Sequence, residues 1–238
     1  MEKIKIAICG YGNLGKGIES EIKKSKDMEF VGIFTRRDPL SLKVHSDTPV
    51  LSINQMNDWK DKVDVMIMCG GSATDLPEQV PTAAKIFNTV DSFDTHARIP
   101  EYFNTVNESA LSANKTSVIS GGWDPGMFSL MRLYANSILK NGETYTFWGK
   151  GVSQGHSDAI RRIKGVKNGV QYTVPVENSV NSVRNGENPE LNTRQKHLRE
   201  CYVVAEEGVN KEEIEKEIKT MKNYFDEYDT TVHFVTEE

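Results

Sequence analysis

The feature that most constrains the fold of this 238-residue chain is an apolar run that leads directly into a glycine-rich turn. The run KIKIAIC (residues 3–9) is short and bounded by glycine, which is typical of a buried strand. Gly10, Gly12 and Gly15 follow it as G-x-G-x-x-G and open a helix expected over residues 14–24. In this context glycines allow a tight turn, a close approach of the backbone to a pyrophosphate, and close packing of helix on strand. We interpret the turn as a dinucleotide site, and a glycine-rich turn without a ligand is the alternative.

Strand-like and helix-like segments alternate through the first half of the chain. Further strand-like runs occupy residues 29–35, 63–71, 88–93 and 116–122. Helical patterns fall between the later runs, at residues 77–87 and 99–114. Alternation of this kind is typical of a parallel sheet with helices on both faces. The expected fold class is therefore α/β, with a Rossmann-type doubly wound dinucleotide-binding domain over residues 1–122.

The pattern changes after residue 122. Helices are expected over residues 127–139 and 211–221, and Ser157 and Asp158 are interpreted as caps of another helix. Strand-like segments rich in Tyr, Phe, Val and Thr occupy residues 144–151, 170–177, 200–207 and 230–237. Their clearer alternation favours a sheet with one open face. We expect residues 123–238 to form a second, α+β domain with a mixed sheet.

Composition and charge exclude several classes of protein. Hydrophobic residues make up 37% and charged residues 26% of the chain, which favours a packed core over disorder. The net charge of -5 disfavours sequence-independent binding of nucleic acid, which relies on clustered Lys and Arg. No apolar run is long enough for a signal peptide or a membrane span, so we expect a cytoplasmic protein without a membrane partner. Cys9, Cys69 and Cys201 lack metal-ligand spacing and are expected as buried thiols, with no bound metal.

The end of the second strand indicates which nucleotide is bound. An acidic residue at this place hydrogen-bonds the ribose 2′-hydroxyl of NAD, whereas arginine accommodates the 2′-phosphate of NADP. Thr35, Arg36 and Arg37 occupy it here, and Asp38 comes slightly later. We therefore favour NADP, and the alternative is that one arginine is only a solvated loop charge. Residues 69–75, a glycine-containing strand end, are expected beside the cofactor because ligands lie at the carboxyl ends of the strands.

Carboxylates follow the fourth and fifth strands of the expected sheet. Asp91, Asp94 and His96 come after one strand, and Trp123 and Asp124 come after the other. Two carboxylates beside a nicotinamide can hold an ammonium group, and one can transfer protons. We favour Asp94 and Asp124 for these roles, interpret Asp91 as a loop-capping residue, and regard His96 as a surface residue.

The second domain has its own polar candidates. Gln154 and the backbone of Gly155 can hydrogen-bond a polar ligand, and Trp148 can form an apolar wall. Thr173 and Arg199 lie on or beside strands. From pattern alone, a strand-forming threonine and a solvated arginine are the simpler interpretations of these two residues.

Together these segments resemble the meso-diaminopimelate dehydrogenase family. The similarity rests on AICGYGNLGKG, VGIFTRRDP, GSATDLPEQ, TVDSFDTH, GGWDPGMFS, TFWGKGVSQGHSDAIRRI, VQYTVP and CYVVAEE, which follow one another across essentially the whole chain. The resemblance implies NADP-dependent oxidative deamination of the D-configured carbon of meso-diaminopimelate. The products would be L-2-amino-6-oxopimelate and ammonia, in a reversible step of lysine biosynthesis. The resemblance also implies a homodimer.

The resemblance implies roles for individual residues. At the cofactor it places Gly10, Tyr11, Gly12, Asn13, Leu14, Thr35, Arg36, Arg37, Cys69, Gly70, Gly71, Ser72, Ser92, Phe93, Asp94, Gly122, Trp123, Asp124, Pro125 and Gly126. At the substrate it places Asp94, Asp124, Trp148, Gln154 and Gly155, with Thr173 and Arg199 on a substrate carboxylate. Carboxylates near the reacting carbon would stabilise a cationic imine. Asp124, together with Asp94, is therefore the expected catalytic group, and Asp124 is the leading candidate for proton transfer.

Family members continue beyond the segment VHFVTEE and use a later His and Asn to bind substrate, so we expect residues 123–238 to be incomplete at the C-terminus. Two alternatives to the dehydrogenase are a non-catalytic or truncated NADPH-binding module and another NADP-dependent reductase of the lysine and aspartate pathways. The Trp-Asp-Pro-Gly turn and the Ser-Gln-Gly-His stretch disfavour the second alternative.

Overall fold

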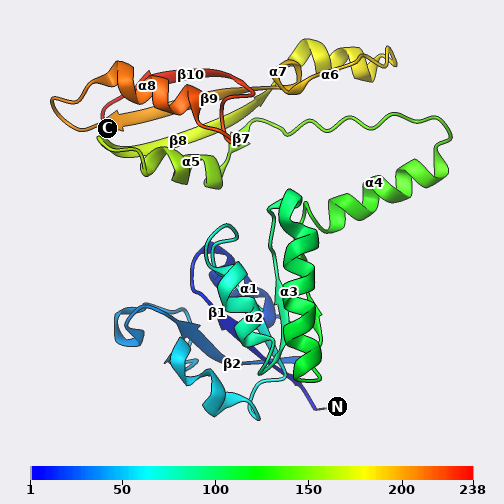
Figure 1. Ribbon diagram of the computed structural model, residues 1–238, viewed down its shortest axis with the longest axis vertical. Helices are drawn as coiled ribbons and strands as arrows, with labels where there is room; N and C mark the ends of the chain where they lie inside the picture. The colour runs from blue at the N-terminus through cyan, green and yellow to red at the C-terminus, as the bar shows by residue number, and fades with distance from the viewer. Residues whose placement is uncertain (1, 238) are drawn as a thin grey trace. The chain divides into compact units, whose positions relative to one another are not determined.

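The computed structural model describes residues 2–237. Contacts divide the chain into two compact units, residues 1–140 and 141–238. Within the described residues, the first unit contains a six-stranded sheet and the second a four-stranded sheet (Figure 1).

The sheet of the first unit is entirely parallel and has the strand order β3-β2-β1-β4-β5-β6. Its strands are β1 (Ile4–Cys9), β2 (Met28–Thr35), β3 (Val50–Ser52), β4 (Val65–Met68), β5 (Asn88–Asp91) and β6 (Ser117–Val118). This order is that of a dinucleotide-binding sheet, which confirms the predicted fold class. The sequence pattern does not predict β3, because three residues are too few to show a period.

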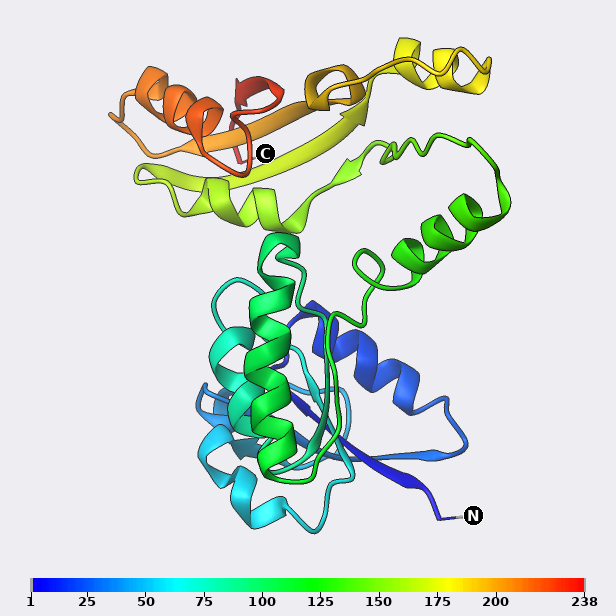
Figure 2. The ribbon, with the colours of Figure 1, turned by 45° about the vertical axis from the view of Figure 1, so that its right-hand side comes forward.

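Helices cover both faces of this sheet. α2 (Leu76–Ala83) and α3 (Ile99–Ser112) pack on the face that includes Ala7. α1 (Asn13–Ile22) packs on the face that includes Ile8. Figure 2 shows α1, in blue, on the other side of the sheet from α3, in green. Adjacent residues of β1 therefore belong to different cores, as the alternation of side chains along a strand requires.

The glycine turn joins β1 to α1 through a close backbone contact. Gly10 has a φ of +101° and donates its N–H to the Phe34 carbonyl at 2.8 Å. A Cβ at Gly15 would lie 2.4 Å from the carbonyl oxygen of Gly10. Only glycine at position 15 lets the helix approach the strand end this closely.

Asp91 ties the carboxyl ends of β5 and β6 to α3. Its Oδ1 accepts hydrogen bonds from the backbone N–H of Phe93 at 2.9 Å and of Ser120 at 3.0 Å. Its Oδ2 accepts the Tyr102 hydroxyl at 2.6 Å. Burial and the neighbouring Asp91 carboxylate raise the pKa of Tyr102, so this hydroxyl keeps the proton that it donates. The prediction that Asp91 caps a loop is therefore confirmed.

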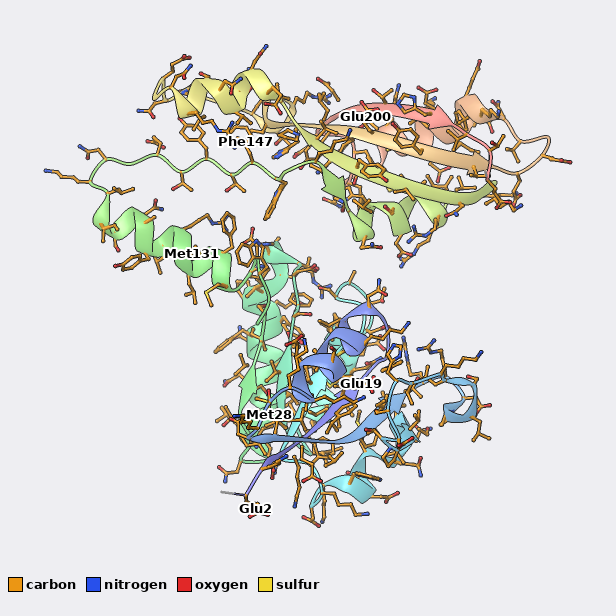
Figure 3. All side chains as sticks on the ribbon, turned by 180° about the vertical axis from the view of Figure 1, so that it is seen from behind. Glu2, Glu19, Met28, Met131, Phe147 and Glu200 are labelled. Carbon is orange, nitrogen blue, oxygen red and sulfur yellow. The ribbon has the colours of Figure 1, made fainter. Side chains whose placement is uncertain are left out.

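The remaining elements of the first unit lie in its connections. They are the 3-10 helices η1 (Pro39–Ser41), η2 (Ile53–Trp59) and η3 (His96–Arg98), and the helix α4 (Met127–Ile138). Large apolar side chains on α4 are exposed, namely Met127, Leu130, Met131, Leu133, Tyr134 and Ile138. Figure 3 labels Met131 on this helix. None of the helices within residues 2–237 combines the length and apolar composition needed to cross a membrane.

The second unit has a mixed sheet in the order β10-β9-β8-β7. Its strands are β7 (Gly151–Val152), β8 (Val166–Pro175), β9 (His197–Ala205) and β10 (Asp229–Phe234). β10 pairs with β9 in parallel, whereas the β9–β8 and β8–β7 pairs are antiparallel. The predicted α+β class with a mixed sheet is confirmed.

Two helices of the second unit close its core. α5 (Gln154–Arg161) and α8 (Lys211–Thr220) supply Ile160 and Ile218, which are buried against Cys201 of the sheet. Two further helices, α6 (Glu177–Arg184) and α7 (Thr193–Lys196), lie in the connection between β8 and β9. Tyr202 is partly exposed on its strand, in agreement with the alternation expected for an open face.

The strand expected over residues 144–151 is wrong. Only Gly151 and Val152 pair with β8, opposite Thr173 and Tyr172. If the antiparallel pairing continued toward the N-terminus, residue 149 would lie opposite Pro175, which is the last residue of β8. Proline offers no N–H to a strand ladder, so the β-prone segment before Gly151 has no edge to join.

The expectation that Ser157 and Asp158 cap a helix is also wrong. α5 begins at Gln154, so both residues lie inside it. Ser157 donates its hydroxyl to the Ser153 carbonyl at 2.6 Å, and Asp158 pairs with Arg162 one turn later. Serine and aspartate tolerate helix interiors when they form such local hydrogen bonds and ion pairs, so residue type alone misplaces the helix start.

We predict that Gly15→Ala lowers the free energy of unfolding by roughly 1–3 kcal/mol, because the new Cβ displaces the Gly10 carbonyl. Gly17 lies two residues further along α1, and a Cβ added there would meet nothing within 4 Å, which makes this position a matched control. Gly17→Ala should stabilise the protein by about 0.5–1 kcal/mol, the usual gain in a helix. Urea unfolding of both variants checks the pair, and equal effects would show that the close contact does not limit stability.

Candidate functional site

A cavity of about 270 Å³ opens at the carboxyl ends of β1, β2 and β4. It is lined by Cys9, Gly10, Tyr11, Gly12, Thr35, Arg36, Arg37, Cys69, Gly70, Gly71, Asp75 and Gln79. Three separate sequence motifs meet here because their strands are neighbours in a parallel sheet. Of the residues expected at the nucleotide, the structure brings together in this cavity those of the glycine turn, of the end of β2 and of residues 69–71, whereas Ser72, residues 92–94 and residues 122–126 do not line it.

The N-terminus of α1 faces this cavity without a side-chain cap. Gly12 is its N-cap residue, and within the described part of the chain no side chain hydrogen-bonds there. Asn13 and Leu14 form the exposed first helical turn. Uncapped N–H groups at a helix N-terminus bind anions well, because they and the helix dipole carry partial positive charge.

Arg36 and Arg37 are both held by neighbouring atoms at the rim. Arg37 Nη2 donates to the Tyr11 carbonyl at 3.0 Å, and its backbone N–H donates to Thr35 Oγ1 at 3.1 Å. Arg36 Nη2 lies 2.8 Å from Asp75 Oδ1. No carboxylate occupies the end of β2, so this position favours a phosphate over a ribose hydroxyl.

The Tyr11 side chain belongs to the core. Its buried hydroxyl donates to Glu19 Oε2 and accepts the backbone N–H of His45 at 3.0 Å. Glu19 is almost fully buried on α1 and also pairs with Lys23 at 3.2 Å (Glu19 is labelled in Figure 3). Tyr11 therefore lines the cavity with its backbone atoms, and its side chain does not take part. Sequence analysis missed Glu19 because a charged residue inside a helix pattern normally marks an exposed face.

Cys9 and Cys69 line the cavity as protonated thiols. Burial raises the pKa of each thiol to about 12. Cys9 Sγ lies 3.7 Å from Gln79 Oε1 on α2, a contact partner that sequence analysis missed. Within residues 2–237 no group of three or more His, Cys, Asp and Glu is placed to hold a metal ion. The prediction of buried free thiols is confirmed.

The loops after β4 and β5 meet through Asp94. Its backbone N–H donates to Ser72 Oγ at 2.9 Å, and its side chain is exposed. Ser92 lies beside Gly122, since a Cβ on that glycine would be 3.9 Å from Ser92 Cβ. Phe93 instead points into the core, where its ring stacks on Tyr102 at 4.1 Å.

The turn from Gly122 to Gly126 places Asp124. Gly126 has a φ of +135°, and a Cβ there would lie 1.8 Å from the Gly122 oxygen, so only glycine closes the turn. Ser129 Oγ and Arg132 Nη2 each donate to Asp124 Oδ1 at 2.8 Å. Sequence analysis missed both partners, although their three-residue spacing on α4 is a usable signal.

Trp123 and Pro125 occupy the same turn. The Trp123 ring is 56% exposed and stacks on Phe128 at 5.5 Å between ring centroids. Pro125 supplies the carbonyl that accepts the Gly122 N–H at 3.2 Å. The backbone of this turn therefore fixes where the Asp124 side chain starts.

A second cavity, of about 370 Å³, lies in the second unit. It is lined by Trp148, Gly149, Gly151, Val152, Ser153, His156, Thr173 and Arg199. Gln154 and Gly155, which the resemblance placed at the substrate, are exposed in the first turn of α5 and do not line it. The cavity therefore brings together Trp148, Thr173 and Arg199 of the predicted substrate residues, while Asp94 and Asp124 belong to the first unit.

Arg199 is the charged centre of this second cavity. It is only 6% exposed, and its Nη1 donates to Thr173 Oγ1. Its guanidinium lies 3.7 Å from the centre of the Tyr228 ring. Among the described residues, Arg199 Nε and Gln171 Oε1 are buried without a hydrogen-bond partner. A buried cation with an unused donor suits a carboxylate ligand.

His156 lines the same cavity as a neutral ring. Burial, followed by the nearby Arg199 charge, lowers the pKa of His156 from 6.5 to about 4. Its Nδ1 lies 2.7 Å from Ser153 Oγ, and its ring packs edge-on against Tyr224 and Phe225. The histidine thus leaves Arg199 as the cation that faces a ligand in this cavity at neutral pH.

We predict that His156 makes the protein less stable in mild acid. The unfolded histidine takes a proton below about pH 6.5, whereas the folded one resists it until about pH 4. Its contribution is therefore complete above pH 6.5 and is lost as the pH falls toward 4. The thermal midpoint of His156→Gln should fall less between pH 7 and pH 4.5 than that of the unsubstituted protein. An equal fall in both proteins would contradict this, and His96→Gln on the surface serves as control.

Comparison with known proteins identifies relatives of one family over the whole chain. The sequence profile described as the diaminopimelic acid dehydrogenase C-terminal domain matches residues 122–238. A meso-diaminopimelate D-dehydrogenase of Ureibacillus thermosphaericus is 63% identical over 238 residues, which is all of this chain and 73% of that protein.

Solved structures agree with this similarity. The Corynebacterium glutamicum diaminopimelate dehydrogenase, solved in complex with diaminopimelate, superposes with a TM-score of 0.92 at 46% identity, over 100% of this chain and 72% of that one. An engineered D-amino acid dehydrogenase bound to NADP+ superposes with a TM-score of 0.86 at 44% identity, over 99% and 72%. The chain belongs to the meso-diaminopimelate dehydrogenase family.

Proposed function

We propose that this protein catalyses the reversible, NADP-dependent oxidative deamination of the D-centre of meso-diaminopimelate. The substrate, NADP+ and water give L-2-amino-6-oxopimelate, ammonium, NADPH and a proton. The observation that carries the proposal is the 63% identity to a meso-diaminopimelate D-dehydrogenase over the whole chain. The place of the reaction in lysine biosynthesis belongs to the same proposal.

The residues of the first cavity fit a phosphorylated dinucleotide. The uncapped N-terminus of α1 suits the pyrophosphate, and Arg36 and Arg37 suit a 2′-phosphate because guanidinium groups bind phosphate through several donors. When bound, NADP+ supplies the hydride acceptor. We assign Cys69 to Ser72, Ser92 to Asp94 and Gly122 to Gly126 to the sides of the same cofactor.

Asp94 and Asp124 are assigned to the reacting amino group. Their carboxylates attract the substrate ammonium, and they stabilise the cationic imine that forms on the substrate when hydride leaves. Water then adds to the imine carbon and ammonia departs. Asp124 moves the protons in these steps, since it has a fixed orientation and a hydrogen-bonded side chain.

The second unit is assigned to the rest of the substrate. Arg199 and Thr173 bind a carboxylate of the substrate. This carboxylate accepts a hydrogen bond from Arg199 Nε, which has no partner among the described residues. Trp148 contributes an apolar wall, and Gln154 with the backbone of Gly155 contributes polar contacts from the start of α5. We propose residues 1–122 as the nucleotide domain and 123–238 as the substrate domain, a boundary supported by the family profile that starts at residue 122. Contacts divide the chain later, between residues 140 and 141, because α4 is grouped with the first unit.

Assembly and location complete the proposal. The exposed apolar side chains of α4 support a homodimer, because contiguous apolar surface commonly marks an interface. The three cysteines are buried free thiols among the described residues, which supports a reducing, cytoplasmic location. Substrate and ammonia are the expected small-molecule partners, and nucleic acid and membrane are not.

The proposed function is tested by following NADP+ reduction with meso-, L,L- and D,D-diaminopimelate in parallel, with NAD+ as the cofactor control. Turnover is expected with the meso isomer and NADP+, and not with the L,L isomer. NADPH binding without turnover on any isomer would favour a non-catalytic nucleotide-binding module instead.

We predict that Arg36→Gln lowers kcat/KM for NADP+ by roughly 10- to 100-fold, because it removes one charged partner of the 2′-phosphate. The value for NAD+ should change by less than about threefold, since NAD+ lacks that phosphate. Arg98→Gln removes an exposed arginine that pairs with Glu101 at 3.4 Å in the same unit and serves as control. Equal losses with both nucleotides would place Arg36 away from the 2′-position.

A further inference from the structure

Both side-chain partners of Asp124 contact the same carboxylate oxygen. Ser129 Oγ and Arg132 Nη2 donate to Oδ1 at 2.8 Å. Within residues 2–237, no hydrogen bond joins a side chain or backbone group to Asp124 Oδ2. The carboxylate is therefore anchored through one oxygen, and the second remains available to a ligand.

The first two turns of α4 build this anchor. Ser129 and Arg132 are three residues apart and so lie on one face of the helix, above the turn that carries Asp124. The Arg132 guanidinium lies 4.7 Å from the centre of the Phe128 ring, and Phe128 stacks on Trp123. Arg132 is thus held between an aromatic stack and the carboxylate, which limits its rotamers.

Burial separates this ion pair from ordinary surface pairs. The Asp124 side chain is 14% exposed and that of Arg132 is 32% exposed. The exposed pairs elsewhere in this unit, such as Lys24 with Glu21 at 66% and 72%, are open to water on both sides. Surface pairs add little, whereas a partly buried guanidinium fixes both the position and the charge of its partner.

We propose that Arg132 is a positioning residue for Asp124, orienting its carboxylate so that Oδ2 meets the substrate amino group. The inference rests on the proposed function, which assigns Asp124 to that group. The Arg132 guanidinium is planar and carries several N–H donors, which suits it to hold a carboxylate oxygen in one orientation. The neutral Ser129 hydroxyl is a second donor to the same oxygen and supports the same orientation.

A double-mutant cycle tests this coupling in the full protein. The variants are Arg132→Met, Asp124→Asn and the two combined, with Arg184→Met at the exposed end of α6 as the matched control. Arg132→Met should lower kcat for meso-diaminopimelate by roughly 10- to 100-fold, as expected for loss of one charged hydrogen bond. In the Asp124→Asn background the same substitution should change kcat by less than about twofold, because its only route of action has been removed.

Binding measurements separate positioning from damage to the fold. The Kd for NADPH should stay within about threefold in Arg132→Met and Arg184→Met, and the Kd of meso-diaminopimelate for the NADPH-loaded protein should rise with Arg132→Met. Arg132→Lys keeps the charge but loses the planar fork, so it should recover part of the lost kcat. Millimolar guanidinium should also restore part of kcat to Arg132→Ala and none to Asp124→Asn.

Each outcome bears on a different assignment. Normal kcat in Arg132→Met with an inactive Asp124→Asn overturns the role of Arg132 and leaves the proposed function intact. A full Arg132→Met loss in the Asp124→Asn background, without rescue by guanidinium, also overturns it, since Arg132 then acts through something else. Normal turnover in Asp124→Asn removes the catalytic assignment of Asp124, and the positioning role is rejected with it.

Discussion

The contact between Gly10 and Gly15 is the constraint on which the first unit depends. β1 is hydrogen-bonded to β2 on one side and β4 on the other, so its end lies in the middle of the sheet. A Cβ at Gly15 would lie 2.4 Å from the Gly10 oxygen, and the absence of that atom lets α1 start directly above the strand end. The uncapped N–H groups of α1 then face the cavity where the loops after β2 and β4 converge. The cavity to which we assign the nucleotide is a consequence of this packing.

Three arginines of the proposed sites have side-chain partners before any ligand arrives. Arg36 is held by Asp75, Arg132 by Asp124, and Arg199 by Thr173 and an aromatic ring. A flexible arginine loses side-chain freedom when it binds an anion, and that loss weakens binding. Folding has already restricted the partly buried Arg132 and the buried Arg199, whereas Arg36 is 62% exposed and its ion pair with Asp75 restricts it less. These are the three positions to which we assign the phosphate, the ammonium group and the carboxylate under the proposed function.

Most of the first unit follows from local pattern, and the failures have local causes. Buried parallel strands appear as short apolar runs, so β1, β2, β4 and β5 can be predicted from sequence, whereas β3 is too short to show a pattern. In the second unit, residues 144–150 have the composition of a strand but no strand edge to pair with, because β8 ends at Pro175. Strand formation depends on a partner strand that is distant in sequence, and the local pattern of residues contains no information about that partner.

The sequence by itself determined the α/β class, the glycine turn at Gly10 and the absence of an acidic residue at the end of β2, because each depends on residue type and near neighbours. Resemblance added the candidate residues of both units. Tertiary structure alone decided how those side chains are held: the Tyr11 hydroxyl is directed into the core, and Asp124 is anchored through one oxygen by Arg132. Side-chain direction and hydrogen-bond partners depend on how the helices and strands pack against one another. That packing exists only in the folded chain, and no periodic pattern of residue types in the sequence reveals it.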